Sequence, residues 1–173
     1  MGNFDKERFA SNNQEFETPK HLYDLLDSEF HFTLDSCASD INHKHTKYYT
    51  KENSLFEHKL IGEVFWMNPP YKDMQKFIQF AHNECLLGAT GVLLIPARTN
   101  TKWWHKYCMT AEVRFICGRP KFVGCKHGLP QPLALVIFRK ENKPKADALH
   151  YSLQHQLCDS APSGASSKFA EQI

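Results

Sequence analysis

Two segments of the chain carry apolar residues at the three- and four-residue spacing that is typical of an amphipathic helix. The first follows Thr18-Pro19, where threonine is suited to cap a helix and proline to occupy its first turn. The second covers about residues 73–87. The two apolar stripes are Leu22, Leu25, Leu26 and Phe30, and Met74, Phe77, Ile78, Ala81 and Cys85. A shorter helix is predicted from Thr101 through Trp103 and Trp104, with one indole in the core and the other partly exposed.

Short apolar runs between these helices predict strands. They cover residues 32–34, 64–67, 91–96, 112–117 and 132–138, with a weak strand near 47–50. The run 91–96 is continuously apolar, as expected of a buried parallel strand. Strands that alternate with helices predict an α/β sheet, in which ligands bind at the carboxyl ends of the strands.

The length of 173 residues favours a single domain. We expect a flexible segment over residues 1–14, the domain over 15–145, and a C-terminal extension over 146–173 that is largely disordered after 158. The N-terminus has no apolar signal region, and no apolar run approaches the ~20 residues that cross a bilayer. The sequence therefore predicts a cytoplasmic protein that does not enter a membrane. The six cysteines lack a paired metal-ligand spacing, so we expect reduced thiols and no metal site.

Positive charge is concentrated in one part of the chain. Residues 98–145 contain 11 Lys and Arg against two acids, whereas residues 1–97 carry a net charge of −5. Such a block is suited to face phosphates, although a basic solvated surface would have the same composition. The candidates for contacts with a nucleic acid are Arg98, Arg119, Lys121 and Lys126.

The turn Asn68-Pro69-Pro70-Tyr71 follows the apolar run 64–67 and precedes the second predicted helix. This turn is suited to hold a planar nitrogen nucleophile. The Asn68 side-chain oxygen and the Pro69 carbonyl can accept hydrogen bonds from the two N–H bonds of an amino group, which frees its lone pair. The two prolines stiffen the turn, and the Tyr71 ring can stack on a base. The sequence thus predicts methyl transfer to an amino group.

A second turn follows the first predicted strand. Asp35 ends that strand and is followed by Ser36, Cys37, Ala38 and Ser39. A carboxylate at this position can bind the amine or ribose of a cofactor, and small side chains let a ligand approach the backbone. An aspartate that only organises its own turn is the alternative. The turn has no G-x-G motif, so its pattern alone leaves both readings open.

Taken together, these residues resemble the DNA N6-adenine methyltransferases of phages and prophages. The similarity covers roughly residues 15–139 and keeps the order of the family's motifs. The matching segments are Glu17-Thr18-Pro19, Phe32-Thr33-Leu34-Asp35 with Ala38, Tyr48-Tyr49-Thr50, Phe65-Trp66-Met67 with the Asn-Pro-Pro-Tyr turn, Leu94 to Thr99, Gly118 to Phe122, and Pro132-Leu133-Ala134.

The resemblance implies a Rossmann-like methyltransferase fold with a mostly parallel twisted sheet flanked by helices. It implies S-adenosylmethionine as methyl donor and N6 of a flipped adenine in DNA as acceptor. The catalytic turn would be Asn68, Pro69, Pro70 and Tyr71, and the cofactor pocket would include Thr18, Pro19, Asp35, Cys37, Ala38, Ser39 and Asn53. Asn53 stands where many relatives have an acidic residue. Glu52 is a candidate to bind the ribose hydroxyls of the donor.

Two other functions remain open on the sequence. The substrate of a protein glutamine N5-methyltransferase also presents a planar nitrogen to such a turn, but that enzyme usually has a glycine-rich cofactor turn. A non-catalytic DNA-binding relative would keep the fold without binding the cofactor. The expected partner is DNA, and the expected state is a monomer or weak homodimer.

Overall fold

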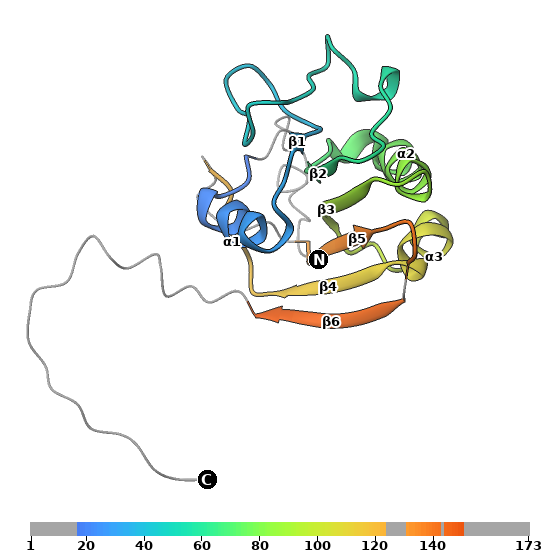
Figure 1. Cartoon of the computed structure of the whole chain (residues 1–173). Helices are drawn as coiled ribbons and strands as arrows, with labels where there is room; N and C mark the ends of the chain where they lie inside the picture. The colour runs from blue at the N-terminus through green and yellow to red at the C-terminus, as the bar shows by residue number, and fades with distance from the viewer. Residues whose placement is uncertain (1–16, 124–130, 143, 151–173) are drawn as a thin grey trace, which may run out of the picture.

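The computed structural model describes residues 17–123, 131–142 and 144–150, and six strands in these ranges form one sheet (Figure 1). The order of the strands across the sheet is β1-β2-β3-β5-β4-β6. Their bounds are β1 Leu34–Asp35, β2 Val64–Met67, β3 Thr90–Pro96, β4 Glu112–Cys117, β5 Leu133–Phe138 and β6 Lys145–His150. Only β5 runs against its neighbours, and the other described strands share one direction. The prediction of a mostly parallel α/β sheet is therefore confirmed.

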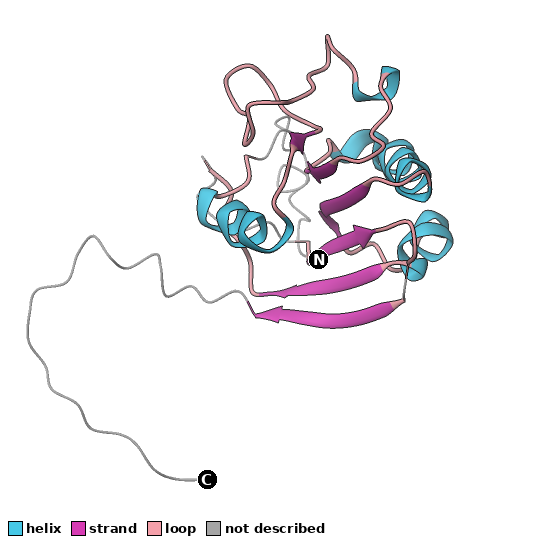
Figure 2. Cartoon of the chain, viewed as in Figure 1, coloured by secondary structure: helices cyan, strands magenta, loops and turns pink. Residues whose placement is uncertain are grey.

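The helices cover both faces of the sheet, as Figure 2 shows. Helix α1 (Lys20–Phe30) lies on one face, and α2 (Met74–Leu86) and α3 (Lys102–Tyr107) lie on the other. Alternate residues of each strand supply the two cores, because successive side chains point to opposite faces. In β2, Trp66 packs with α1, whereas Phe65 and Met67 pack with α2. Short 3₁₀ turns, Leu55–Glu57, Tyr71–Asp73 and Cys108–Thr110, join these elements.

The centre of the sheet is packed closely enough to require a glycine. Gly91 in β3 pairs with Phe65 in β2, and a Cβ at this position would clash with the Phe65 ring. This explains why the apolar run of β3 begins with a residue that is a poor strand former.

Several local predictions are wrong in detail. Thr18 does not cap α1: Pro19 is the N-cap residue, it has no side-chain cap bond, and its carbonyl accepts the first backbone bonds of the helix. Leu25, which the spacing places in the core, is 51% exposed. Tyr23, which is not part of the predicted stripe, is buried in the core. Trp103 and Trp104 are both buried, whereas the sequence analysis expects one of the two indoles to be partly exposed. The segment near 47–50 contributes only an isolated bridge between Asp35 and Tyr48.

Strand β6 has no counterpart in the sequence analysis. It pairs with β4 from Lys145 to His150, so the sheet continues past residue 145, where the sequence places the end of the domain. The predictions for residues 1–14, for the chain after 150 and for Lys126 lie outside the described residues. None of the described helices is both long enough and apolar enough to cross a membrane.

Candidate active site

The loops that follow β1, β2, β3 and β4 all leave the same edge of the sheet, because these strands run in one direction. The loops at this edge carry Asp35 to Ser39, the Asn68-Pro69-Pro70 corner, Arg98, and Arg119 with Lys121. Ligands of parallel α/β sheets bind at this edge. In Figure 1 the long segment between β1 and β2 rises above it.

A pocket with a volume of about 410 Å³ opens between the first two of these loops. This volume lies within the range of ~300–1,000 Å³ that is usual for small-molecule sites. Its walls combine both predicted turns with the segment 49–56 and the start of α2. The lining residues from the two turns and from the N-terminal side of α1 are Thr18, Asp35, Ser36, Cys37, Ala38, Ser39, Asn68, Pro69 and Pro70.

The side-chain amide of Asn68 is fixed by a contact from a distant part of the chain. Its Nδ2 donates a hydrogen bond to Oγ1 of Thr18, at 3.2 Å, and the Thr18 side chain is buried. With the nitrogen held in this way, the carbonyl oxygen of the amide is turned away from Thr18. Pro69 is buried and Pro70 has an extended backbone, with φ of −62° and ψ of 139°. The corner is thus stiff before any ligand arrives.

Asp35 organises the loop that follows it. Its Oδ1 accepts a bond from the Cys37 N–H at 3.3 Å, and its Oδ2 accepts one from the Lys44 N–H at 2.9 Å. Burial raises the pKa of the Asp35 carboxyl, and these two backbone bonds oppose that rise. The aspartate therefore has the turn-forming role that the sequence left open, and it also lines the pocket.

Three of the predicted catalytic and cofactor-binding residues do not line the pocket. Tyr71 begins the 3₁₀ turn after the corner, and its half-buried ring packs against the core beneath α2. Pro19 is buried at the start of α1. The Asn53 side chain is exposed and its Oδ1 bonds Nε2 of His58 at 2.8 Å. Glu52, its neighbour, does line the pocket.

Other lining residues were not predicted from the sequence. The rings of Phe56 and Phe77 lie 4.9 Å apart at one wall, and Lys76 Nζ lies 4.0 Å above the centre of the Phe56 ring. Lys44 contributes a cation whose Nζ is 2.8 Å from a Glu17 oxygen. A usable signal existed for Lys76 and Phe77, because they lie on the first turn of the helix after Pro70. Phe56 had none, since the apolar residues around it in the sequence show no regular spacing.

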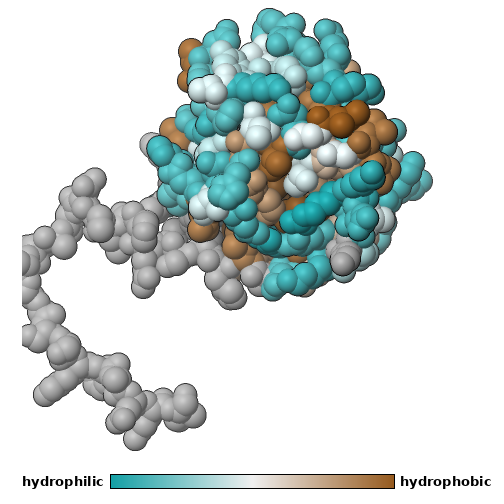
Figure 3. Space-filling model, in the orientation of Figure 1, coloured by the Kyte–Doolittle hydropathy of each residue, from teal (hydrophilic) through white to brown (hydrophobic). Residues whose placement is uncertain are grey.

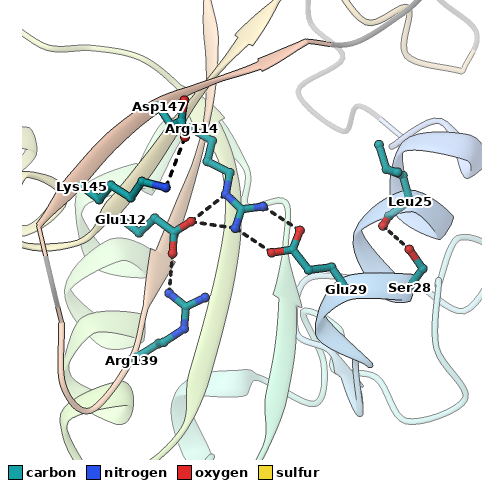
Figure 4. A network of polar contacts seen from close by, with 8 residues as sticks. All are labelled: Leu25, Ser28, Glu29, Glu112, Arg114, Arg139, Lys145 and Asp147. Atoms are coloured by element: carbon teal, nitrogen blue, oxygen red, sulfur yellow. Dashed lines mark hydrogen bonds and ion pairs between the residues drawn. The ribbon is translucent and has the colours of Figure 1, made fainter.

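The basic block of residues 98–145 is divided between two roles. Arg98, Arg119 and Lys121 are exposed at the edge of the sheet that holds the pocket. The loop after β4, which carries Arg119 and Lys121, is attached to the site. Val123 in this loop forms an isolated β-bridge with Glu17, the neighbour of Thr18. Arg114 and Arg139 instead bind Glu29 and Glu112 across α1, β4 and β5, as Figure 4 shows. These two arginines belong to the framework and do not form part of a phosphate-facing surface.

An α/β sheet of this kind, with a rigid Asn-Pro-Pro corner in a pocket at its carboxyl edge, defines the protein as an amino-group methyltransferase. Residues 7–159 match the family described as DNA N-6-adenine-methyltransferase (Dam). The DNA N-6-adenine-methyltransferase of Haemophilus phage HP1 (strain HP1c1) is 30% identical over 139 residues, which cover 75% of this chain and 78% of the phage protein. The chain belongs to the DNA N-6-adenine-methyltransferase (Dam) family, as its motifs predict. Members of this enzyme family are named for methyl transfer to DNA, a reaction that requires a methyl donor.

Proposed function

We propose that this protein transfers a methyl group from S-adenosylmethionine to N6 of an adenine in DNA. The observation that carries the proposal is that the Asn68-Pro69-Pro70 corner and the Asp35–Ser39 loop face one pocket. A donor held by the second loop would present its methyl group to an amine held by the first. Membership of the family supports the same reaction.

The donor fits the chemistry of the pocket lining. S-adenosylmethionine supplies a methyl group on a positively charged sulfur, and it also carries a carboxylate, an amine, ribose hydroxyls and an adenine. The pocket offers carboxylates at Asp35 and Glu52 and cations at Lys44 and Lys76. The rings of Phe56 and Phe77 offer apolar surface for a flat base. We therefore assign donor binding to the part of the pocket between the Asp35–Ser39 loop and these rings.

Asn68 and Pro69 would activate the acceptor. The Asn68 Oδ1 and the Pro69 carbonyl oxygen would accept hydrogen bonds from the two N–H bonds of the adenine amino group. The nitrogen would then become pyramidal, and its lone pair would no longer be delocalised into the ring. The nitrogen would then attack the methyl carbon in line. The N–C bond would form as the S–C bond breaks with its electron pair on sulfur, and N6 would release one proton to solvent. Placement of acceptors before the reaction is the main contribution of the protein.

The target adenine would have to leave the double helix to reach a pocket of this kind. Arg98, Arg119 and Lys121 are exposed at the same edge, and we propose that they contact the phosphates on either side of the target. The reaction would take place where bacterial or phage DNA is found, in the cytoplasm.

The function is tested by incubating the purified chain with plasmid DNA and S-adenosylmethionine that is labelled in its methyl group. After digestion of the DNA to nucleosides, the label is expected in N6-methyldeoxyadenosine. Label in methylglutamine of added protein, with none in DNA, would favour a protein amide methyltransferase. DNA binding without uptake of the donor in a calorimetric titration would indicate a non-catalytic relative.

A further inference from the structure

The loop after Asp35 carries a hydrophobic residue that is almost completely exposed. Ser39 and Asn42 exchange two backbone hydrogen bonds, of 3.0 and 3.1 Å, and thereby close a tight turn. Asp40 and Ile41 form the tip of this turn. Ile41 is 98% exposed, more than any other large hydrophobic residue in the described part of the chain. An isoleucine at such a tip contributes nothing to the core.

The turn that carries Ile41 is stiff. The Tyr48 hydroxyl donates to the Asp40 carboxylate at 3.1 Å. The His43 ring stacks on Tyr48, with 4.3 Å between the ring centres and 7° between the planes. The Lys44 N–H bonds the buried Asp35 carboxylate. Because these contacts hold the backbone of the turn, little backbone conformational entropy is lost when Ile41 enters a binding partner.

The tip lies beside the pocket. Ser39 and Asn42, the two residues that close the turn, both line the pocket, as does Lys44 just after it. In Figure 1 the segment leaves the carboxyl end of β1. Figure 3 shows that hydrophilic residues cover much of the upper part of this face, with a few apolar groups among them.

We propose that Ile41 is a wedge that enters the base stack of DNA next to the target adenine. This inference rests on the proposed function. Proteins that distort DNA often insert an apolar side chain such as isoleucine between base steps, and a flipped base leaves a gap that such a side chain can fill. The wedge lowers the cost of extruding the adenine, and therefore acts only when the target is stacked and paired.

The test compares methylation by the wild type, Ile41→Ala and Ile41→Leu on three DNA substrates. These are a duplex with a paired target adenine, the same duplex with an abasic site opposite the target, and a single strand. Ile61→Ala is the matched control. Ile61 is 60% exposed but precedes the amino end of β2, at the opposite edge of the sheet.

For Ile41→Ala, kcat/KM on the paired duplex is expected to fall about tenfold or more, with activity on the other two substrates within about twofold of the wild type. Ile41→Leu, which keeps an apolar wedge, and Ile61→Ala should retain activity on all three. A fluorescent 2-aminopurine at the target position should brighten on binding to the wild type and much less on binding to Ile41→Ala.

Several results would overturn the proposal. Equal activity of Ile41→Ala and wild type on the paired duplex would do so, as would an equal loss on all three substrates. Conversion of a dimer to a monomer by Ile41→Ala in sedimentation, with duplex activity unchanged, would assign the tip to a protein interface. Wild-type activity on single strands alone would refute the wedge and leave the proposed function intact. Wild-type inactivity on every DNA substrate would overturn both.

Discussion

The buried hydroxyl of Thr18 lies 3.2 Å from Nδ2 of Asn68, although the two residues are 50 positions apart in the chain. Thr18 comes from the segment that leads into α1, and Asn68 comes from the end of β2. The contact fixes the plane of the Asn68 amide. Thr18 therefore acts as a positioning residue for the corner on which the proposed chemistry depends.

Replacement of Thr18 by valine should lower kcat, because the amide would no longer be held in one orientation. Loss of a buried hydrogen bond typically costs about 1–3 kcal/mol, which corresponds to roughly a 5- to 150-fold effect on the rate. Steady-state kinetics with separate kcat and KM values would measure it. Thr18→Ser retains the hydroxyl and should restore most of the rate. A change confined to the KM of the donor would show instead that Thr18 contacts the donor.

The exposed cations at the carboxyl edge should control DNA affinity. Arg119→Glu with Lys121→Glu should weaken binding and reduce the slope of log affinity against log salt, because fewer counterions are released from the phosphates. Fluorescence anisotropy with a labelled duplex at several salt concentrations would measure both quantities. Lys140→Glu is the matched control, because Lys140 is exposed but follows β5, whose direction places it at the opposite edge. An equal effect of the two changes would mean that binding depends on overall charge alone.

The network around Glu112 predicts how the stability of the fold depends on pH (Figure 4). Burial would raise the pKa of Glu112, but hydrogen bonds from Arg139 and Arg114 outweigh it and lower that pKa below its ordinary value of 4.5. The hydrogen bond from Arg114 likewise lowers the pKa of Glu29. A carboxyl group with a lowered folded pKa stabilises the fold fully above its ordinary pKa. This contribution is lost as the pH falls through the lower, folded value.

We therefore expect the free energy of unfolding to decrease as the pH falls below about 4.5, and Glu112→Gln to remove part of this dependence. At neutral pH this change should cost about 1.5–3 kcal/mol, since Glu112 is largely buried and binds two arginines. Urea unfolding at pH 7 and pH 3.5 would measure it. The exposed pair Lys20–Asp24 provides a control, and Asp24→Asn should cost less than about 1 kcal/mol. Equal costs for the two changes would contradict the role of the network.

Much of the architecture could be predicted from local patterns. The continuous apolar run of β3 identifies a strand that is buried on both faces. The apolar stripe of α2 identifies a helix that is buried on one face, because its apolar residues recur at helical spacing. β6 could not be predicted in this way, because Lys145–His150 has no continuous apolar run and acquires its structure by pairing with β4. The reversed direction of β5 has no local signal either.

The two turns of the candidate site could be predicted, because Asn-Pro-Pro and the Asp35 turn are unusual sequences at strand ends. Their convergence in one pocket follows from the parallel order of β1 and β2. The contact of Thr18 with Asn68 could not be predicted, since the Thr-Pro pair at the start of α1 is equally typical of a helix cap. The exposure of Ile41 could not be predicted either, because a single isoleucine in a polar segment gives no hydrophobic periodicity.

The most direct test of the central claim compares the wild type with Asn68→Ala in a single-turnover assay for N6-methyladenine, with donor and DNA binding measured on the same preparations. The account predicts that Asn68→Ala lowers the rate roughly 100- to 1,000-fold, because an acceptor for the reacting amine is lost. Both binding affinities should stay nearly unchanged. An Asn68→Ala protein that methylates adenine as fast as the wild type would contradict the account.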